Sequence, residues 1–422
     1  MRNHAQPLEA KTENQRWPTV IFSHGLGGSR NAYSHICGTL ASHGIIVIAP
    51  EHRDGSAPVT YIQTSTSKKP RPLFYRRITH TPSPEVFEHR DKQLKIRLWE
   101  MGLIHDAVTK IDCGELEVPP VLSQTNREQG ELREVLASLA QKLDIHEPGK
   151  LVFAGHSFGA ATCVQFTKSV YYNRQSDDPA YSPLYSPDPD SALTRQVTPD
   201  TPLLLLDMWA VPLRSPSTEW LWSQPLPCYH SPHGASNVLT ILSEAFFKWR
   251  DNLSSTKRAL SEDPTRDSGE YARTKTPAAF FYPAGSAHLS QSDFGVLFPN
   301  VTRMAFKCDE PERALLLNAR AMLQTLRCCG YAVAPSAKLD EEESKANADA
   351  VELSVEEPDG DWRILAPTGG IRGWVAVELD GEPASDSDGS VGSAGSVKLA
   401  SAADAAGMAE GEVLGDVVAQ RA

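Results

Sequence analysis

The pentapeptide Gly155–Gly159 (GHSFG) restricts the fold of this chain more than any other feature of its sequence. The apolar run Leu151–Ala154 precedes it, and a helix-compatible segment, Ala160–Lys168, follows it. A strand that enters a helix through so tight a turn needs glycine on both sides of the serine, because side chains at those positions would clash. The pattern therefore predicts a strand–turn–helix unit that lifts the Ser157 hydroxyl clear of a sheet.

Short apolar runs alternate with helical patterns along most of the chain. The predicted strands are Thr19–Phe22, Ile45–Ala49, Leu151–Ala154, Leu203–Leu206, Val238–Leu242 and Ala278–Tyr282, and the predicted helices include Asn31–His43, Glu85–Ile111, Glu128–Leu143 and Glu310–Cys329. Uninterrupted apolar strands separated by helices are typical of a parallel sheet covered on both faces. We therefore expect an α/β fold.

Composition divides the chain into three parts. We expect a polar N-terminal segment at 1–16, a catalytic domain at 17–333 with an irregular insertion at 171–201, and a tail at 334–422. The sequence from Gly330 onward holds 19 acidic and 6 basic residues, so it accounts for the net charge of −12. Disorder is expected for this tail, in which only Trp362–Val377 hints at local structure. The remainder is nearly neutral, which argues against a nucleic-acid partner.

The N-terminus and the cysteines indicate a reducing compartment. Residues 1–16 lack the apolar stretch of a secretory signal, and no run approaches the roughly 18 apolar residues of a membrane span. The 7 cysteines are scattered, and none lies in a metal-binding spacing. We therefore expect a cytoplasmic protein with reduced, buried thiols that binds no metal or other cofactor.

The base that would activate Ser157 is expected at His288. A serine hydroxyl is a weak nucleophile unless a histidine accepts its proton and a carboxylate orients that histidine. In folds with this turn the chain order is serine, acid, histidine. His288 follows the predicted strand Ala278–Tyr282 in a loop, whereas the rival residues His230 and His233 lie in a proline-rich stretch before a strand.

The orienting acid is expected at Asp207, which directly follows the predicted strand Leu203–Leu206. A carboxylate at the carboxyl end of a central parallel strand faces the edge of the sheet where active sites form. The rival residues Asp200 and Asp251 do not follow strand ends.

Backbone amides are expected to bind the oxyanion that forms during acyl transfer. One is the amide of Phe158, directly after the serine, and the second comes from a loop after an earlier strand. The turn-rich loop His24–Gly28 follows the predicted strand Thr19–Phe22, and Leu26 is our candidate for the second amide. Phe158 and Trp209 could form the floor of a shallow acyl pocket; the alternative is that both are core residues.

These segments together resemble the platelet-activating factor acetylhydrolases of the plasma and type II intracellular kind, which have the α/β-hydrolase fold. The resemblance covers roughly residues 17 to 330 and rests on Pro18–Gly28, Leu40–Gly44, Glu51–Asp54, Gly155–Gly159 with Ala161–Thr162, Leu206–Leu213, and Gly285–His288 with Asp293–Phe294. Family members carry the opening strands of the sheet before the first of these segments, so we expect those strands to be missing here.

The resemblance implies a calcium-independent esterase that releases short or oxidised acyl groups from the middle carbon of glycerophospholipids. Acetyl from platelet-activating factor is the type case, and the phospholipid would be met at a membrane or lipid-particle surface. It also implies the triad Ser157, Asp207 and His288, with the amides of Leu26 and Phe158 as the oxyanion hole.

Two other functions remain open from the sequence. One is a generic carboxylesterase or dienelactone-type hydrolase that acts on soluble esters. The other is a non-catalytic protein that retains the hydrolase fold as a scaffold. Labelling of Ser157 by a fluorophosphonate would distinguish the second, because only an activated serine reacts.

Overall fold

The computed structural model describes residues 16–64, 69–115, 126–173, 181–266, 274–306, 308, 310–334 and 360–379. Within them the main sheet has the strand order β10–β9–β8–β7–β6–β1–β2, and β5 pairs with β1. All its pairings are parallel except that of β10 with β9. Its strands are β1 (Trp17–Ser23), β2 (Ile46–Ile48), β5 (Leu143–Asp144), β6 (Val152–His156), β7 (Leu203–Leu206), β8 (Val238–Ile241), β9 (Ala279–Pro283) and β10 (Trp374–Ala376).

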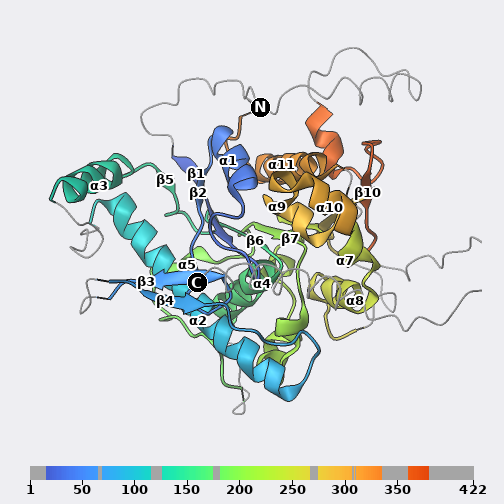
Figure 1. The fold of residues 1–422 in the computed structure, drawn as a ribbon, viewed down its shortest axis with the longest axis horizontal. Helices are drawn as coiled ribbons and strands as arrows, with labels where there is room; N and C mark the ends of the chain where they lie inside the picture. Colours follow the sequence, from blue (N-terminus) through green and yellow to red (C-terminus); the bar gives the residue numbers. More distant parts are fainter. Residues whose placement is uncertain are drawn as a thin grey trace, which may run out of the picture.

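Helices cover both faces of this sheet: α1 and α11 lie on one face, and α2, α4 and α8 lie on the other (Figure 1). The helices of the described residues are α1 (Ser34–Ser42), α2 (Pro84–Cys113), α3 (Asn126–Ser138), α4 (Phe158–Tyr171), α5 (Ala192–Gln196), α6 (Glu219–Trp222), α7 (Glu244–Lys248), α8 (Arg250–Ala259), α9 (Phe294–Leu297), α10 (Pro299–Phe306) and α11 (Pro311–Cys328). Each face of the sheet buries its own apolar layer, so the predicted α/β architecture is confirmed.

The central strands bring the predicted site residues to one edge of the sheet. All four residues of β7 are buried, as expected for a strand that is covered on both faces. The end of β6 is in register with the end of β7, where His156 pairs with Leu206, and Leu206 pairs with Ile241 of β8. Ser157 and Asp207 therefore leave neighbouring strands at the same level.

The long helix α2 has a polar buried stripe as well as the predicted apolar face. Its N-terminus is capped by Ser83, whose hydroxyl accepts a hydrogen bond from the Val86 amide at 3.2 Å, and it ends at Gly114, whose φ is 72°. The predicted core residues of this helix, such as Leu98, are fully buried, but so are Arg90 and Arg97. Buried charges must be paired, so this stripe requires partners from the loops that α2 covers.

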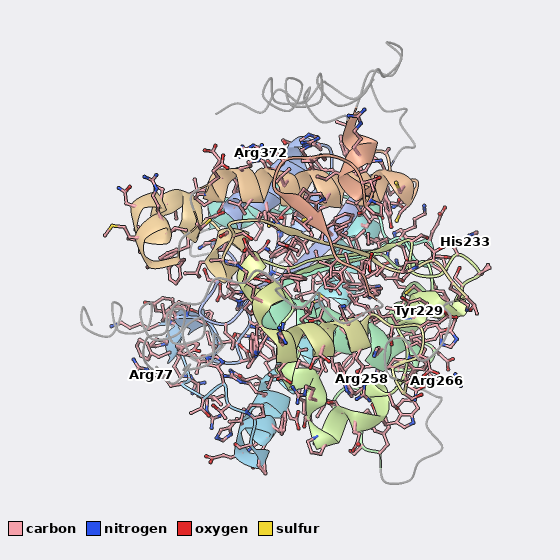
Figure 2. All side chains as sticks on the ribbon, turned by 90° about the vertical axis from the view of Figure 1, so that its right-hand side faces the viewer. Arg77, Tyr229, His233, Arg258, Arg266 and Arg372 are labelled. Atoms are coloured by element: carbon pink, nitrogen blue, oxygen red, sulfur yellow. The ribbon has the colours of Figure 1, made fainter. Side chains whose placement is uncertain are left out.

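Within the tail that was expected to be disordered, the stretch that hinted at local structure, Trp362–Val377, lies in an ordered segment. Residues 360–379 form the 3₁₀ helix η6 (Gly360–Leu365) and β10, which adds an antiparallel edge strand beside β9. Trp374 stacks on Phe281 with ring centroids 5.3 Å apart, and Ile364 is completely buried. Arg372, near the surface in Figure 2, forms a bidentate ion pair with Glu310. These contacts dock residues 360–379, which hold two acidic and two basic residues and are more apolar than the acidic tail around them.

Other elements were not predicted from the sequence. The hairpin β3 (Val59–Ile62) and β4 (Arg71–Phe74) forms a separate two-stranded sheet, and α9 and α10 follow the histidine loop. In the insertion 171–201, Tyr185 stacks on Phe166 of α4 at 5.7 Å, so its described part packs on the core. The cysteines form no disulfide, but Cys113 and Cys328 are exposed, contrary to the expected burial. Among the described helices, none is both long and apolar enough to span a bilayer.

Candidate active site

Ser157 occupies the strained turn that the glycine pattern predicts. It joins β6 to α4 with φ 56° and ψ −117°, a conformation that L-residues rarely adopt. A Cβ atom on Gly159 would lie 1.9 Å from the Ser23 carbonyl oxygen, and one on Gly155 would lie 2.5 Å from the Gly159 carbonyl carbon. Larger residues are therefore excluded at both positions. Ser157 is also the residue before the first turn of α4, where unpaired amides favour negative charge.

The turn of Ser157 is tied directly to the turn that carries Asp207. The Ser157 amide donates to the Leu206 carbonyl at 2.8 Å, and the Trp209 amide donates to the Ser157 carbonyl at 3.3 Å. Asp207 has φ 46°, so both residues depart from ordinary backbone at the same sheet edge. Such strain persists only where surrounding contacts enforce it, and it clusters at functional sites.

Asp207 and His288 form a buried pair. The Nδ1 atom of His288 lies 2.7 Å from Oδ2 of Asp207, and the two residues are 5% and 0% exposed. The second carboxylate oxygen of Asp207 accepts a hydrogen bond from the Ser243 amide at 2.6 Å. Both oxygens are thus engaged, which fixes the carboxylate and leaves Nε2 of His288 as the ring nitrogen that faces away from it.

The imidazole of His288 is held between two rings. Phe246 of α7 stacks on it with centroids 4.1 Å apart and an interplanar angle of 2°, and His156 lies 4.4 Å away at 37°. Because His156 directly precedes Ser157, this contact brings the imidazole to the serine turn. Burial, followed by the nearby charge of His288, lowers the pKa of His156 well below its usual value. His156 therefore stays neutral beside the predicted base.

The loop His24–Gly28 lies against the serine turn, as predicted. A Cβ atom on Gly25 would lie 3.0 Å from the Cβ of Ser157. The amide of Gly25 donates to the Tyr33 hydroxyl at 3.0 Å, and the amide of Gly27 donates to the Ser56 carbonyl at 2.8 Å. The described residues offer no hydrogen-bond acceptor to the amides of Leu26 or Phe158, so both remain available to a ligand.

Phe158 and Trp209 lie in the core, beneath the serine turn, rather than in an open pocket. They are 0% and 3% exposed, and their rings meet edge to face at 6.0 Å. The guanidinium groups of Arg97 and Arg90 cover these rings at 4.4 and 5.0 Å. The alternative that both aromatics are core residues is therefore the one that the structure favours.

The rival candidates for the base and the acid lie elsewhere. His230 is exposed, with Nε2 2.7 Å from the Tyr172 hydroxyl, and His233 is exposed at the margin of the molecule (Figure 2). Asp200 is exposed in a turn, and Asp251 pairs with Arg214 on the surface at 2.8 Å. None of these residues contacts the serine turn through any interaction recorded among the described residues.

A second serine–histidine–carboxylate chain was missed by the sequence analysis. The hydroxyl of Ser23, the last residue of β1, lies 2.8 Å from Nε2 of His52, and Nδ1 of His52 lies 2.9 Å from the Glu100 carboxylate. Ser23 and His52 are both 0% exposed. The available signal was the polar stripe of α2, in which Arg97 and Glu100 interrupt the apolar helix face.

Metal-ligand side chains also converge at the predicted site. Of the described residues, His156, Asp207 and His288 bring their donor atoms within 4.8 Å of one another. The carboxylate of Asp207 already accepts from His288 and Ser243, and Nδ1 of His156 lies 2.9 Å from the Tyr33 hydroxyl. Because both carboxylate oxygens of Asp207 are already engaged, the donor set does not fit a metal ion well, although Nε2 of His156 has no hydrogen-bond partner among the described residues.

The fold and the site define the class of the protein. A mostly parallel sheet, a serine at a strained strand–helix turn, an acid after the next strand and a histidine after a later strand make up the α/β-hydrolase class. The family model described as "Platelet-activating factor acetylhydrolase, isoform II" matches residues 3–334. The chain belongs to this family of hydrolases.

Two sequence relatives agree with this membership. A protein of Schizosaccharomyces pombe called "Putative phospholipase A2" is 29% identical over 74% of this chain and 68% of its own length. The platelet-activating factor acetylhydrolase of Bos taurus is 37% identical over 36% of this chain, but the match spans only 32% of the bovine protein. A solved ferulic acid esterase from Streptomyces cinnamoneus is 15% identical over 75% of this chain and 67% of its own, with a TM-score of 0.38.

Proposed function

We propose that this protein is a serine esterase in which Ser157 is the nucleophile, His288 the base and Asp207 the acid that orients the base. The observation that carries the proposal is the buried Asp207–His288 pair at 2.7 Å, whose imidazole lies with its ring centroid 4.4 Å from that of His156, the residue before the strained serine. An acid–base pair held this firmly beside a strained serine is the geometry that nucleophilic catalysis requires.

Each step of the reaction has a residue to perform it. The Ser157 hydroxyl attacks the ester carbonyl and passes its proton to Nε2 of His288, while Asp207 stabilises the imidazolium through Nδ1. The carbonyl oxygen becomes an oxyanion, which the amides of Leu26 and Phe158 bind. His288 then returns the proton to the departing alcohol, and water removes the acyl group from Ser157 by the same sequence in reverse. Neutral His156 does not compete for the proton.

An apolar pocket beside the site suits a substrate with a hydrocarbon chain. The pocket has a volume of about 220 Å³ and lies between the loop His24–Gly28 and the start of α9. Its wall includes Leu26, His156, Leu289 and Phe294. Asp293, before α9, ties this side of the pocket to the start of α1, because its carboxylate accepts from the Ser34 amide at 2.6 Å and from the His35 amide at 2.9 Å.

Family membership and this pocket support one substrate class. We propose hydrolysis of the short acyl ester at the middle glycerol carbon of phospholipids, as in platelet-activating factor and its oxidised analogues, without calcium. Leu297 of α9 and the next residue, Phe298, line the pocket and are 68% and 50% exposed. Exposed apolar side chains beside a pocket for lipid favour a substrate taken from a membrane or lipid-particle surface.

The test is turnover of phosphatidylcholines whose middle acyl chain has two, four, eight or sixteen carbons, with p-nitrophenyl acetate as a soluble reference. We expect turnover to fall steeply with chain length, because each methylene left outside the pocket forfeits on the order of 1 kcal/mol. EDTA should leave the rates unchanged. Turnover of p-nitrophenyl acetate alone would favour a generic carboxylesterase, and comparable turnover of the sixteen-carbon lipid would favour a general phospholipase.

A further inference from the structure

Arg97 is a completely buried arginine at the middle of α2. Burying a guanidinium is costly unless its N–H groups are paired. Its Nε atom donates to the Asp54 carboxylate at 2.6 Å, and Nη2 donates to the Ser56 hydroxyl at 2.6 Å. Burial alone would raise the pKa of Asp54, but the charge of Arg97 and the neighbouring hydrogen bonds together outweigh burial and lower this pKa to about 2. These contacts neutralise the guanidinium and fix its plane.

The remaining contacts of Arg97 reach both halves of the predicted oxyanion hole. Its Nη1 atom donates to the His24 carbonyl at 2.7 Å. That carbonyl belongs to the peptide group between His24 and Gly25, and the Leu26 amide belongs to the next peptide group. The same guanidinium lies over the ring of Phe158, 4.4 Å from its centroid. A single rigid group thus touches the segments that carry the Leu26 and Phe158 amides, although these segments lie far apart in the sequence.

We propose that Arg97 is a positioning residue that sets the two amide donors of the oxyanion hole, Leu26 and Phe158, at the separation that the oxyanion needs. The inference rests on the proposed esterase function. Arg97 is covered by the serine turn and the loop, so it acts through the backbone of these segments and does not touch the substrate.

Neighbouring hydrogen bonds hold the loop His24–Gly28 through its backbone and through the His24 ring. The His52 amide donates to Nε2 of His24 at 3.1 Å, which orients that ring, and Nδ1 of His24 lies 2.9 Å from the Gly25 carbonyl. Ser56, which accepts from Arg97, also accepts through its carbonyl from the Gly27 amide at 2.8 Å. Arg97 is therefore linked to the loop on both sides of Leu26.

The expected effect follows from how an oxyanion hole works. Its amides stabilise the transition state only if they are already aimed when the charge develops, and loss of one donor lowers kcat by about 10²–10³-fold. Releasing the His24 carbonyl would let the Leu26 amide turn away. Ground-state binding in the apolar pocket does not depend on that amide, so KM should change little.

The experiment compares Arg97→Met with Arg90→Met in the full chain. Arg90 is a matched control, because it is also 0% exposed on α2 and also covers an aromatic ring, but it donates to Gln93 at 2.7 Å and to the Ile78 carbonyl at 3.0 Å. The measurements are kcat and KM for p-nitrophenyl acetate, melting temperature, and the inhibition constant of an alkyl trifluoromethyl ketone. Ser157 adds to that ketone reversibly and leaves an oxyanion in the hole.

We expect Arg97→Met to lower kcat about 100-fold with KM nearly constant, and to weaken the ketone by a similar factor. Arg90→Met should lower melting temperature comparably and kcat less than about fivefold. Two milder variants are used if Arg97→Met does not fold. Arg97→Lys keeps the charge beside Asp54 but loses the planar guanidinium, and Ser56→Ala removes one hydrogen-bond acceptor of Arg97. Each should lower kcat about tenfold.

Two results would overturn the inference. One is a folded Arg97 or Ser56 variant with wild-type kcat and wild-type ketone affinity, and the other is a kcat loss no larger than that of Arg90→Met. Failure of the proposed function is a different outcome, because the wild-type chain itself would then neither hydrolyse p-nitrophenyl acetate nor bind the ketone.

Discussion

Two serine–histidine–carboxylate groupings lie near each other in this molecule, and only one has the surroundings of a nucleophile. In the first, His288 pairs with Asp207 at 2.7 Å beside Ser157. In the second, Ser23, His52 and Glu100 form a continuous chain with contacts of 2.8 and 2.9 Å. Judged by residue types and hydrogen bonds alone, the second grouping looks the more complete.

The difference lies in the backbone and in access. Ser23 ends an ordinary strand, is 0% exposed, and its hydroxyl also accepts from Arg97 at 3.3 Å, so no substrate can approach it. Ser157 has φ 56°, precedes a helix N-terminus and is 4% exposed. A hydrogen-bonded serine becomes a nucleophile only where the carbonyl that it attacks, and the amides that bind the oxyanion, also have room. The second chain is instead part of the support beneath the loop His24–Gly28.

Replacing the two serines would test this comparison with the largest expected effect. Ser157→Ala should lower turnover about 10⁶-fold and abolish fluorophosphonate labelling, because only oxyanion-hole catalysis remains. Ser23→Ala removes a hydrogen bond to His52, worth about 1 kcal/mol, and a longer one from Arg97, which keeps its contacts to Asp54, Ser56 and the His24 carbonyl, so turnover should fall less than tenfold. Labelling at Ser23, or one tenth of wild-type turnover in Ser157→Ala, would contradict the assignment.

Replacing His288 and His230 would test the assignment of the base in the first grouping. His288→Ala should be as damaging as Ser157→Ala, about 10⁶-fold in kcat, because the serine then lacks its base. His230→Ala, at an exposed position beside Tyr172, is the control and should leave turnover within a factor of two or so. The check is kcat on p-nitrophenyl acetate together with melting temperature. A reversed ranking of the two variants would move the base to the proline-rich loop.

The pH dependence of stability tests the burial of the second grouping, with a smaller expected effect. Burial, followed by the charge of Arg97, lowers the pKa values of His24 and His52 below the usual 6.5. The unfolded chain therefore binds more protons below pH 6.5, and the free energy of unfolding should fall there by up to about 1.4 kcal/mol per pH unit for each histidine. At higher pH both states are neutral and the effect vanishes.

Denaturant titrations between pH 7 and 5 check this prediction. His52→Gln should reduce the slope of unfolding free energy against pH, whereas His230→Gln should reduce it less, because His230 is exposed. Asp54 adds its own loss only at lower pH, from about 3.8 down to about 2, since its pKa is depressed in the folded state. Equal slopes for wild type and His52→Gln would show that His52 is not a buried neutral imidazole.

The sequence alone predicted the central strands of the sheet and the turn that carries Ser157. Apolar runs such as Leu203–Leu206 became buried parallel strands, and the glycines around Ser157 predicted a turn that tolerates no side chain. The proximity of Ser157, Asp207 and His288 was also predictable, because each follows a strand of one parallel sheet and such strands end at a common edge. Each of these inferences uses a local pattern whose structural outcome is nearly independent of the rest of the chain.

Only the tertiary structure decided which side chains pair and pack around these strands and this turn. Arg97 pairs with Asp54, 43 residues earlier, and Trp374 docks on Phe281 from a short segment within the acidic tail. The spacing of such residues in the sequence does not predict their pairing, because a buried charge is stabilised by whichever partner the fold brings to it. The sequence determined which serine stands at the turn, and long-range packing decided which amides and charges are held around it.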